Sequence, residues 1–341
     1  MAVVAFMSAK GSPGTTTTAQ LLAALWPRPV LLVDADTDGG DIALRLLRED
    51  GAPVDRNRGL LSLLALARRE MSPSVLVEHA QVLRGGTELI SGLAGPDQAG
   101  AAQLLWDNLG RAFAGSTTHD VLLDCGRVSS ASPHLQLVQH ADLLLSVLRP
   151  TVSGIIHTRE RLTDLSRVLG SGGPAPRVRV IVIGDGKKDR DVSGAATLLQ
   201  RDLPGVEVVG VLADDAEGAS VLSGLELSRP ERTLLVRSAH PVVAAVAALA
   251  GVVPEPGQAG HVPPQATDGQ DGTAGPDRVP PSAPQRRGRR AAKREKKGRR
   301  ARRTEQTAAG GNTLPAPGTP ALEDYVAAAA APPPPPAGTA P

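Results

Sequence analysis

The chain has 341 residues, of which 41% are hydrophobic but only 1% aromatic, so alanine, leucine and valine must pack most of its core. Its single cysteine, Cys125, excludes an intrachain disulfide framework, and no apolar run approaches the roughly 18 residues that a membrane span needs. The net charge of +2 joins two opposed parts, because residues 286–303 hold twelve Lys or Arg against one Glu, whereas the remainder holds 25 basic and 34 acidic residues. With no basic and apolar leader ahead of the first apolar run, we expect a cytoplasmic protein without a transmembrane segment.

A glycine-containing loop stands between the first two predicted elements. Residues 3–7 form an apolar run typical of a buried strand, and residues 19–26 have the pattern of a helix. Between them, residues 10–18 read KGSPGTTTT. A strand, a glycine loop and a helix in this order direct backbone N–H groups at one point, where the helix dipole also favours negative charge. We therefore expect the loop to bind phosphate.

Two carboxylates follow the next predicted strand. Residues 29–33 form a short apolar run typical of a strand buried on both faces, and Asp34 and Asp36 come directly after it. Ligands of open α/β sheets bind at the carboxyl ends of the strands, so these carboxylates should face the phosphate loop. The alternative is a strand that ends in a solvated acidic turn.

The middle of the chain alternates between helical and extended patterns. We expect a helix in residues 59–70, a continuation of the helical layer in 75–82, a strand in 87–92, a loop of small residues in 95–100 and a helix in 101–113. A strand in residues 120–124 then ends in Asp124, where a carboxylate can hold magnesium through water. Cys125 follows, and one thiol is too few for an iron–sulfur cluster, so we expect a small core residue.

The pattern continues through the second half of the chain. We expect strands in residues 141–148, 178–183 and 205–212 and helices in 153–168, 192–200, 219–225 and 241–250. These elements predict a three-layer α/β fold over residues 1–251, with a mostly parallel twisted sheet of about seven strands and helices on both faces. The seven histidines lack the spacing of metal ligands, and we expect most of them on the surface or in loops.

Three of these segments resemble motifs of one ATPase family. Residues 10–17 resemble the deviant Walker A motif K-G-G-x-G-K-T-T of the ParA/MinD ATPases, and residues 34–40 resemble the family's D-x-D-P-x-G-G segment. The strand that ends in Asp124 resembles the family's Walker B pattern. The resemblance implies a SIMIBI-class P-loop domain that binds ATP and Mg²⁺ and forms a homodimer.

The resemblance also implies roles for single residues. The residues that it assigns to phosphate binding are Lys10, Gly11, Ser12, Pro13, Gly14, Thr15, Thr16 and Thr17. Thr16, Asp34 and Asp124 would serve the magnesium ion, and Asp36 would orient the attacking water. Lys10 matches the signature lysine, which reaches the partner's phosphates in a nucleotide-sandwich dimer and assists catalysis. Many relatives carry an asparagine near the position of residue 185 that contacts the adenine base, and Asp185 is the nearest equivalent in this chain. The sequence therefore leaves open which base the nucleotide carries.

One residue departs from the family pattern. Thr15 stands where the family has its P-loop lysine. A charge-assisted contact is worth about 1.5 to 3 kcal/mol, so affinity would fall roughly tenfold to a hundredfold. Hydrolysis is more sensitive, because positioned cations supply roughly three to five orders of magnitude in phosphoryl transfer. We expect nucleotide binding to persist, with hydrolysis that is weak, dependent on a partner or absent.

The composition changes after residue 251. Residues 252–341 lack apolar periodicity and are rich in proline, alanine and glycine, which predicts a disordered tail. The basic block at residues 286–303 suits non-specific duplex DNA or an acidic membrane surface, and a solubilising stretch without a dedicated partner is the alternative. Residues 321–336, an alanine-rich stretch followed by a proline run, are a candidate protein-binding segment.

Two functions follow from these expectations. The first is a ParA/MinD-like protein that dimerises with nucleotide and positions DNA, as in partition or segregation, or a membrane-associated machine, acting from the cytoplasm at the nucleoid or membrane. The second is a catalytically inactive pseudo-ATPase scaffold that localises a secretion, pilus or septum complex. A SIMIBI-class synthetase or amidotransferase is disfavoured, because the sequence shows no second catalytic constellation.

Overall fold

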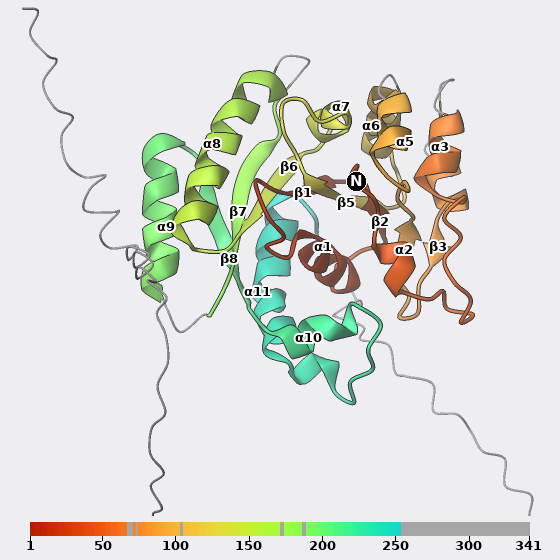
Figure 1. Cartoon of the computed structure of the whole chain (residues 1–341). Helices are drawn as coiled ribbons and strands as arrows, with labels where there is room; N and C mark the ends of the chain where they lie inside the picture. The colour runs from red at the N-terminus through yellow and green to blue at the C-terminus, as the bar shows by residue number, and fades with distance from the viewer. Residues whose placement is uncertain (67–70, 73, 103–104, 171–173, 186–188, 254–341) are drawn as a thin grey trace, which may run out of the picture. The chain divides into compact units, whose positions relative to one another are not determined.

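The protein is described from a computed structural model, which covers residues 1–253 apart from 67–70, 73, 103–104, 171–173 and 186–188 (Figure 1). The predicted tail, with its basic block at residues 286–303 and the segment at 321–336, therefore lies outside the described residues from 254 onward. No helix among the described residues combines the length and the apolar character that a membrane crossing requires.

An eight-stranded sheet forms the centre of the described region, in the order β3-β4-β2-β5-β1-β6-β7-β8. The strands are β1 (Val3–Ser8), β2 (Val30–Asp34), β3 (Gln81–Val82), β4 (Glu88–Ile90), β5 (Asp120–Arg127), β6 (Leu143–Leu148), β7 (Arg177–Gly184) and β8 (Glu207–Ala213). All neighbours pair in parallel except β3 and β4. The predicted α/β class is confirmed, with one strand more than expected.

Helices cover both faces of this sheet. They are α1 (Thr15–Ala24), α2 (Ile42–Arg45), α3 (Leu60–Leu66), α4 (Ser74–Glu78), α5 (Pro96–Ala101), α6 (Trp106–Ala114), α7 (Leu135–Gln139), α8 (Val152–Leu169), α9 (Asp189–Asp202), α10 (Ala216–Val221) and α11 (Leu234–Leu249). Buried side chains of α3 to α9 pack on one face, and those of α1, α2 and α11 pack on the other. The chain thus has the expected three layers.

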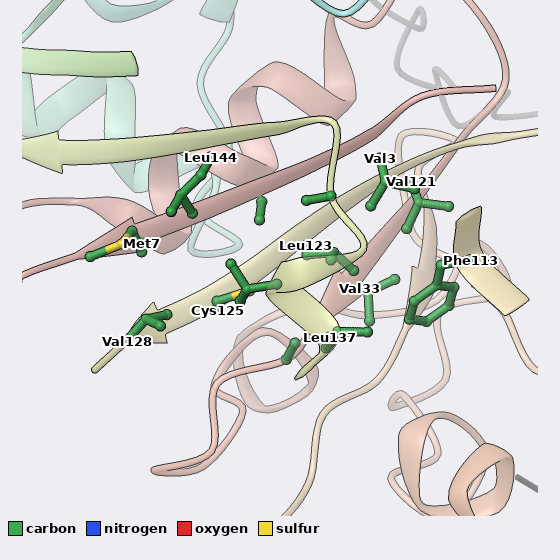
Figure 2. Close-up of a cluster of buried hydrophobic side chains, with 14 of the residues drawn as sticks. Val3, Met7, Val33, Phe113, Val121, Leu123, Cys125, Val128, Leu137 and Leu144 are labelled. Carbon is green, nitrogen blue, oxygen red and sulfur yellow. The ribbon is translucent and has the colours of Figure 1, made fainter. Parts of the chain in front are cut away.

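Alternation along β1 shows how one strand serves two cores. Val3, Ala5 and Met7 contribute to the core under α3 to α9. Figure 2 shows Val3 and Met7 in this core. Val4 and Phe6 point to the opposite face, into the core under α1 and α11. Successive side chains of a strand point to opposite faces, so an unbroken apolar run is what a strand covered on both sides requires.

Three predicted segments differ from the structure. Residues 95–100 were expected to be a loop but contain α5, because Pro96 at the first position and Asp97 in the first turn favour a helix start. Residues 75–82 were expected to be helical throughout, yet α4 ends at Glu78 and β3 adds an antiparallel edge strand. The last helix was expected to start at Pro241 but starts at Leu234, where the Thr233 side chain accepts a hydrogen bond from Val236 N.

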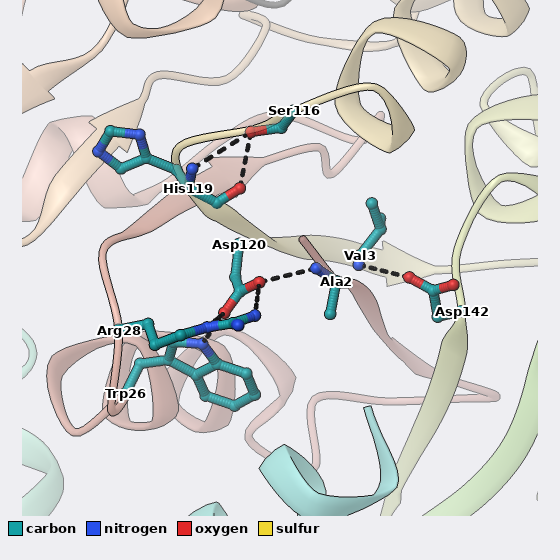
Figure 3. A network of polar contacts seen from close by, with 8 residues as sticks. All are labelled: Ala2, Val3, Trp26, Arg28, Ser116, His119, Asp120 and Asp142. Atoms are coloured by element: carbon teal, nitrogen blue, oxygen red, sulfur yellow. Dashed lines mark hydrogen bonds and ion pairs between the residues drawn. The ribbon is translucent and has the colours of Figure 1, made fainter. Parts of the chain in front are cut away.

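One buried carboxylate, Asp120, joins the elements at the amino ends of the central strands (Figure 3). It accepts hydrogen bonds from the backbone N–H of Ala2 at 2.7 Å and from Trp26 Nε1 at 2.8 Å. Arg28 donates to both carboxylate oxygens, at 2.9 and 2.6 Å. A buried charge is tolerated when it is paired and fully hydrogen-bonded, so Asp120 is structural and joins β1, β5 and the end of α1.

Candidate functional site

The glycine loop between β1 and α1 has the backbone shape that an anion site needs. Gly11 has φ 71° and Gly14 has φ 112°, and a Cβ built on either residue would meet no atom of the described residues within 4 Å. Gly14 precedes α1, and no side chain in the described part of the chain caps this helix. The first N–H groups of a helix have no partner within it, so those at the start of α1 stay available to a ligand. This geometry suits a phosphate group.

The threonines of the first turn differ in their surroundings. Thr15 is only 6% exposed, and its Oγ1 has no hydrogen-bond partner among the described residues. The hydroxyl of Thr16 lies close enough to Asp124 to lower the pKa of that carboxyl. Thr18 Oγ1 instead donates to the Gly14 carbonyl oxygen at 2.8 Å. A buried hydroxyl without a hydrogen-bond partner costs free energy, so the Thr15 hydroxyl would gain from donating to an oxygen of a bound ligand.

Asp34 and Asp124 lie opposite each other at the carboxyl ends of β2 and β5. Both carboxyls are buried, Asp34 Oδ2 accepts from Ile42 N at 3.2 Å, and Asp124 Oδ1 accepts from Gly126 N at 3.3 Å. Asp124 Oδ2 has no partner in the described part of the chain. Burial raises the pKa of both carboxyls, and the charge of Asp124 raises the pKa of Asp34 further.

Asp36 stands beside this pair and packs on the turn that follows Asp124. Its Oδ1 accepts from Asp38 N at 2.9 Å, and burial raises its pKa. A Cβ on Gly126 would lie 2.2 Å from Asp36 Oδ2, so the absence of a side chain at Gly126 leaves room for the carboxylate. The structure thus brings the glycine loop, the acidic turn after β2 and the end of β5 together at one edge of the sheet.

These residues fit a nucleotide phosphate and a magnesium ion. An uncapped helix start, an unpartnered Thr15 hydroxyl and an unpartnered Asp124 oxygen lie within one neighbourhood. No three His, Cys, Asp or Glu side chains of the described residues group closely enough to hold a metal by themselves. Magnesium at a phosphate site usually takes one or two protein carboxylates and fills its other positions with water and phosphate oxygen.

Lys10 extends from the glycine loop to helix α8. Its Nζ lies 3.1 Å from Nε2 of His157. Both side chains line a pocket of about 290 Å³ between the glycine loop and the turn from β6 to α8, where Arg149 and Thr151 also lie. The predicted contact of Lys10 with a partner's phosphates remains a prediction.

Solved structures match the fold of this chain over most of the described residues. A ParA family ATPase from Chlorobium tepidum is 18% identical, with 72% of this chain and 98% of that chain covered and a TM-score of 0.57. An ATP complex of McdA from Cyanothece is 16% identical, with 74% and 97% covered and a TM-score of 0.56. MinD from Pyrococcus horikoshii with Mg-ADP is 20% identical, with 73% and 97% covered and a TM-score of 0.53. This chain has the ParA/MinD fold.

The comparisons by sequence give no match. No family model and no curated protein matches the chain. The ParA/MinD fold is therefore visible in the arrangement of strands and in short motifs, while most side chains differ from those of the solved structures.

Two residues of this ParA/MinD fold were missed from the sequence. His134 lies in the turn before α7 but is fully buried, and its Nε2 lies 3.2 Å from the Cys125 carbonyl oxygen. Its burial lowers the pKa to about 4, so the ring is neutral at physiological pH. Arg127 forms an ion pair with Asp38 at 2.6 Å. The spacing of His134 and Arg127 in the sequence gives no signal for either contact.

Cys125 belongs to the core of the ParA/MinD fold. Its side chain is fully buried, and burial together with the nearby charges of Asp124 and Asp36 raises the pKa of the thiol well above its usual value. A thiol that keeps its proton is a poor nucleophile. The arrangement therefore agrees with the expected structural role.

The buried carboxyls predict an unusual pH dependence of stability. The pKa of Asp34 rises to about 8 in the folded protein, whereas an unfolded aspartate titrates near 3.8. The folded state thus binds more protons between these values, so this contribution is complete below about pH 4 and is lost as the pH rises towards 8. Without magnesium or nucleotide, we expect the thermal midpoint to fall by several degrees from about pH 6 to about pH 8.5.

Calorimetry of two variants tests the origin of this dependence. Asp34→Asn should reduce the decrease of the thermal midpoint with pH, because the amide does not titrate. Asp164→Asn changes an exposed carboxylate on α8 and should leave the fall unchanged. A slope in Asp34→Asn equal to that of the wild type would assign the dependence to other groups.

Proposed function

We propose that this chain binds a nucleoside triphosphate with magnesium, dimerises in that state and positions DNA or a membrane-associated machine. The observation that carries the proposal is the meeting of an uncapped glycine loop with Asp34, Asp36 and Asp124 at one edge of the sheet. The McdA structure holds ATP and the MinD structure holds Mg-ADP, which supports ATP as the nucleotide of this chain.

The proposal gives each part of the site a task. Backbone N–H groups at the start of α1, with Thr15 and Thr17, bind phosphate oxygens. Thr16, Asp34 and Asp124 hold magnesium, which when bound offsets the negative charge of the phosphates. Asp36 orients the attacking water from its place over Gly126. Lys10 leaves His157 to reach the phosphates of the partner in the dimer.

Hydrolysis in this proposal is slow or depends on a partner. Positioned cations stabilise the charge that develops in phosphoryl transfer, and Thr15 carries none. The same observation favours a second candidate function, a pseudo-ATPase scaffold that localises a secretion, pilus or septum complex. In that function, nucleotide and dimer contacts are structural.

Nucleotide binding and phosphate release, measured side by side, decide between the two functions. We expect the wild type to bind fluorescent ATP in the presence of magnesium and to release phosphate slowly, and Asp36→Ala to bind with similar affinity without releasing phosphate. Turnover that Asp36→Ala abolishes would exclude the scaffold. Tight binding without turnover, also in the presence of DNA or anionic vesicles, would exclude the enzyme.

The basic block at residues 286–303 is proposed to bind duplex DNA without sequence preference. Twelve positive side chains displace counterions from the phosphate backbone, so binding should weaken steeply with salt. Deleting residues 286–303 should abolish retention on DNA at low salt and leave nucleotide binding unchanged. Unchanged DNA retention after the deletion would reject this proposal, and retention on anionic vesicles alone would assign the block to a membrane surface. Residues 321–336 remain a candidate segment for a protein partner.

A further inference from the structure

Arg127 lies between the two loops that form the proposed phosphate site. It is the last residue of β5 and pairs in register with Ser8, the last residue of β1 before the glycine loop. Gly126 precedes it with φ 56° and supports the Asp36 carboxylate. The backbone of Arg127 therefore adjoins the strand end that leads into the glycine loop, and its side chain reaches the acidic turn at Asp38.

The side chain of Arg127 is held by an ion pair that is exposed to solvent. Its terminal nitrogen donates to Asp38 Oδ2 at 2.6 Å, and the two side chains are 59% and 54% exposed. Asp38 in turn donates its backbone N–H to Asp36, so the ion pair adjoins the residue proposed to orient water. Exposed ion pairs contribute little to stability, so Arg127 can leave Asp38 for a group of higher negative charge with little loss of free energy.

The charge of the site makes such an exchange favourable. Asp36 and Asp124 lie at the edge where a triphosphate would add further negative charge, and Thr15 supplies no cation. Lys10 is directed at His157 on α8. A guanidinium offers several donors in a planar fork that matches phosphate oxygens, and it keeps its charge at all physiological pH values.

We propose that Arg127 contacts the terminal phosphate of a bound nucleoside triphosphate and supplies part of the charge that is missing at Thr15. This inference rests on the proposed nucleotide binding and extends it to a residue of the β5 turn. Arg127 then distinguishes a triphosphate from a diphosphate, because only the triphosphate has the group that it contacts.

Equilibrium binding of fluorescent ATP and fluorescent ADP with magnesium tests the inference. Arg127→Gln should weaken ATP binding roughly tenfold to a hundredfold, the loss expected for one charge-assisted contact, and should change ADP binding less than about threefold. Arg127→Lys should recover part of the loss, since it keeps the charge without the fork. Arg167→Gln is the matched control, because it removes another exposed arginine–aspartate ion pair, with Asp164 on α8.

Asp38→Asn separates contact with phosphate from a merely structural role. It breaks the same ion pair but leaves the guanidinium free, so ATP binding should stay unchanged or tighten. If Arg127 only holds the acidic turn in place, Asp38→Asn and Arg127→Gln will weaken ATP binding equally. Thermal unfolding of all variants verifies that each is folded at the temperature of the measurement.

The outcomes distinguish this inference from the proposed function. One outcome overturns only the role of Arg127. In it, the wild type binds ATP and ADP, and Arg127→Gln either keeps both affinities or loses both to the same extent. Wild-type protein that binds neither ATP nor ADP overturns the proposed function and the inference with it. If Arg127→Gln loses ATP affinity but not ADP affinity, and Asp38→Asn keeps its ATP affinity, both the proposed function and the inference are supported.

Discussion

Replacing Thr15 by lysine is expected to tighten nucleotide binding about tenfold to a hundredfold and to raise phosphate release by about three orders of magnitude. Thr15 is the first residue of α1, directly after the open Gly14, and its buried hydroxyl has no partner among the described residues. In the proposed function, an ammonium group extending from this position would meet the phosphates at the edge where Asp34, Asp36 and Asp124 lie. Titration with fluorescent ATP and a phosphate-release assay measure the two effects.

A variant of similar side-chain length without charge controls for packing. Thr15→Met adds length at the same buried position, so it should not increase either quantity. Equal gains in Thr15→Lys and Thr15→Met would show that filling the site, rather than charge, causes the change. No gain in Thr15→Lys that folds normally would contradict the alignment of residues 10–17 with the Walker A motif.

Replacing Gly126 by alanine in the Thr15→Lys protein is expected to lower phosphate release by about a hundredfold or more, with nucleotide affinity within about threefold. The new Cβ would lie 2.2 Å from Asp36 Oδ2, so the carboxylate must move away from the place where it would orient water. The residue also has φ 56°, which costs an alanine roughly 1 to 3 kcal/mol. Single-turnover release after loading with ATP separates the chemical step from binding.

A second glycine provides a matched control for backbone strain. Gly205 has φ 91°, and a Cβ there would meet no atom within 4 Å among the residues that the structure describes, so Gly205→Ala carries backbone strain far from the site. It should lower the thermal midpoint and leave phosphate release unchanged. If Gly126→Ala releases phosphate as fast as Gly205→Ala, the position of Asp36 does not limit the reaction.

The central strands could be predicted because their sequence meets one strong physical condition. Strands β1, β2, β5 and β6 are covered on both faces, and only continuous apolar runs satisfy that condition. The edge strand β3 escaped prediction because it has two residues and depends on pairing with β4. The start of α11 also escaped, because the helix continues through Pro241, which usually marks a boundary.

The candidate site could be predicted in part for a related reason. In a parallel sheet the carboxyl ends of the strands share one edge, so Asp34 and Asp124 were expected near the glycine loop from their order alone. The contacts of Lys10 with His157 and of Arg127 with Asp38 join residues far apart in the chain. Such contacts depend on how the loops pack, and no local pattern in the sequence records them.

The two ends of β5 have opposite thermodynamic character. Asp120 at its start is satisfied by four hydrogen bonds, whereas Asp124 near its end is equally buried and keeps one oxygen without a partner among the described residues. A chain shaped for stability alone would gain by losing the second carboxylate. In the proposed function, a magnesium ion with its water shell would supply the partner that this Asp124 oxygen lacks, so binding would stabilise the end of β5 that folding alone leaves unsatisfied.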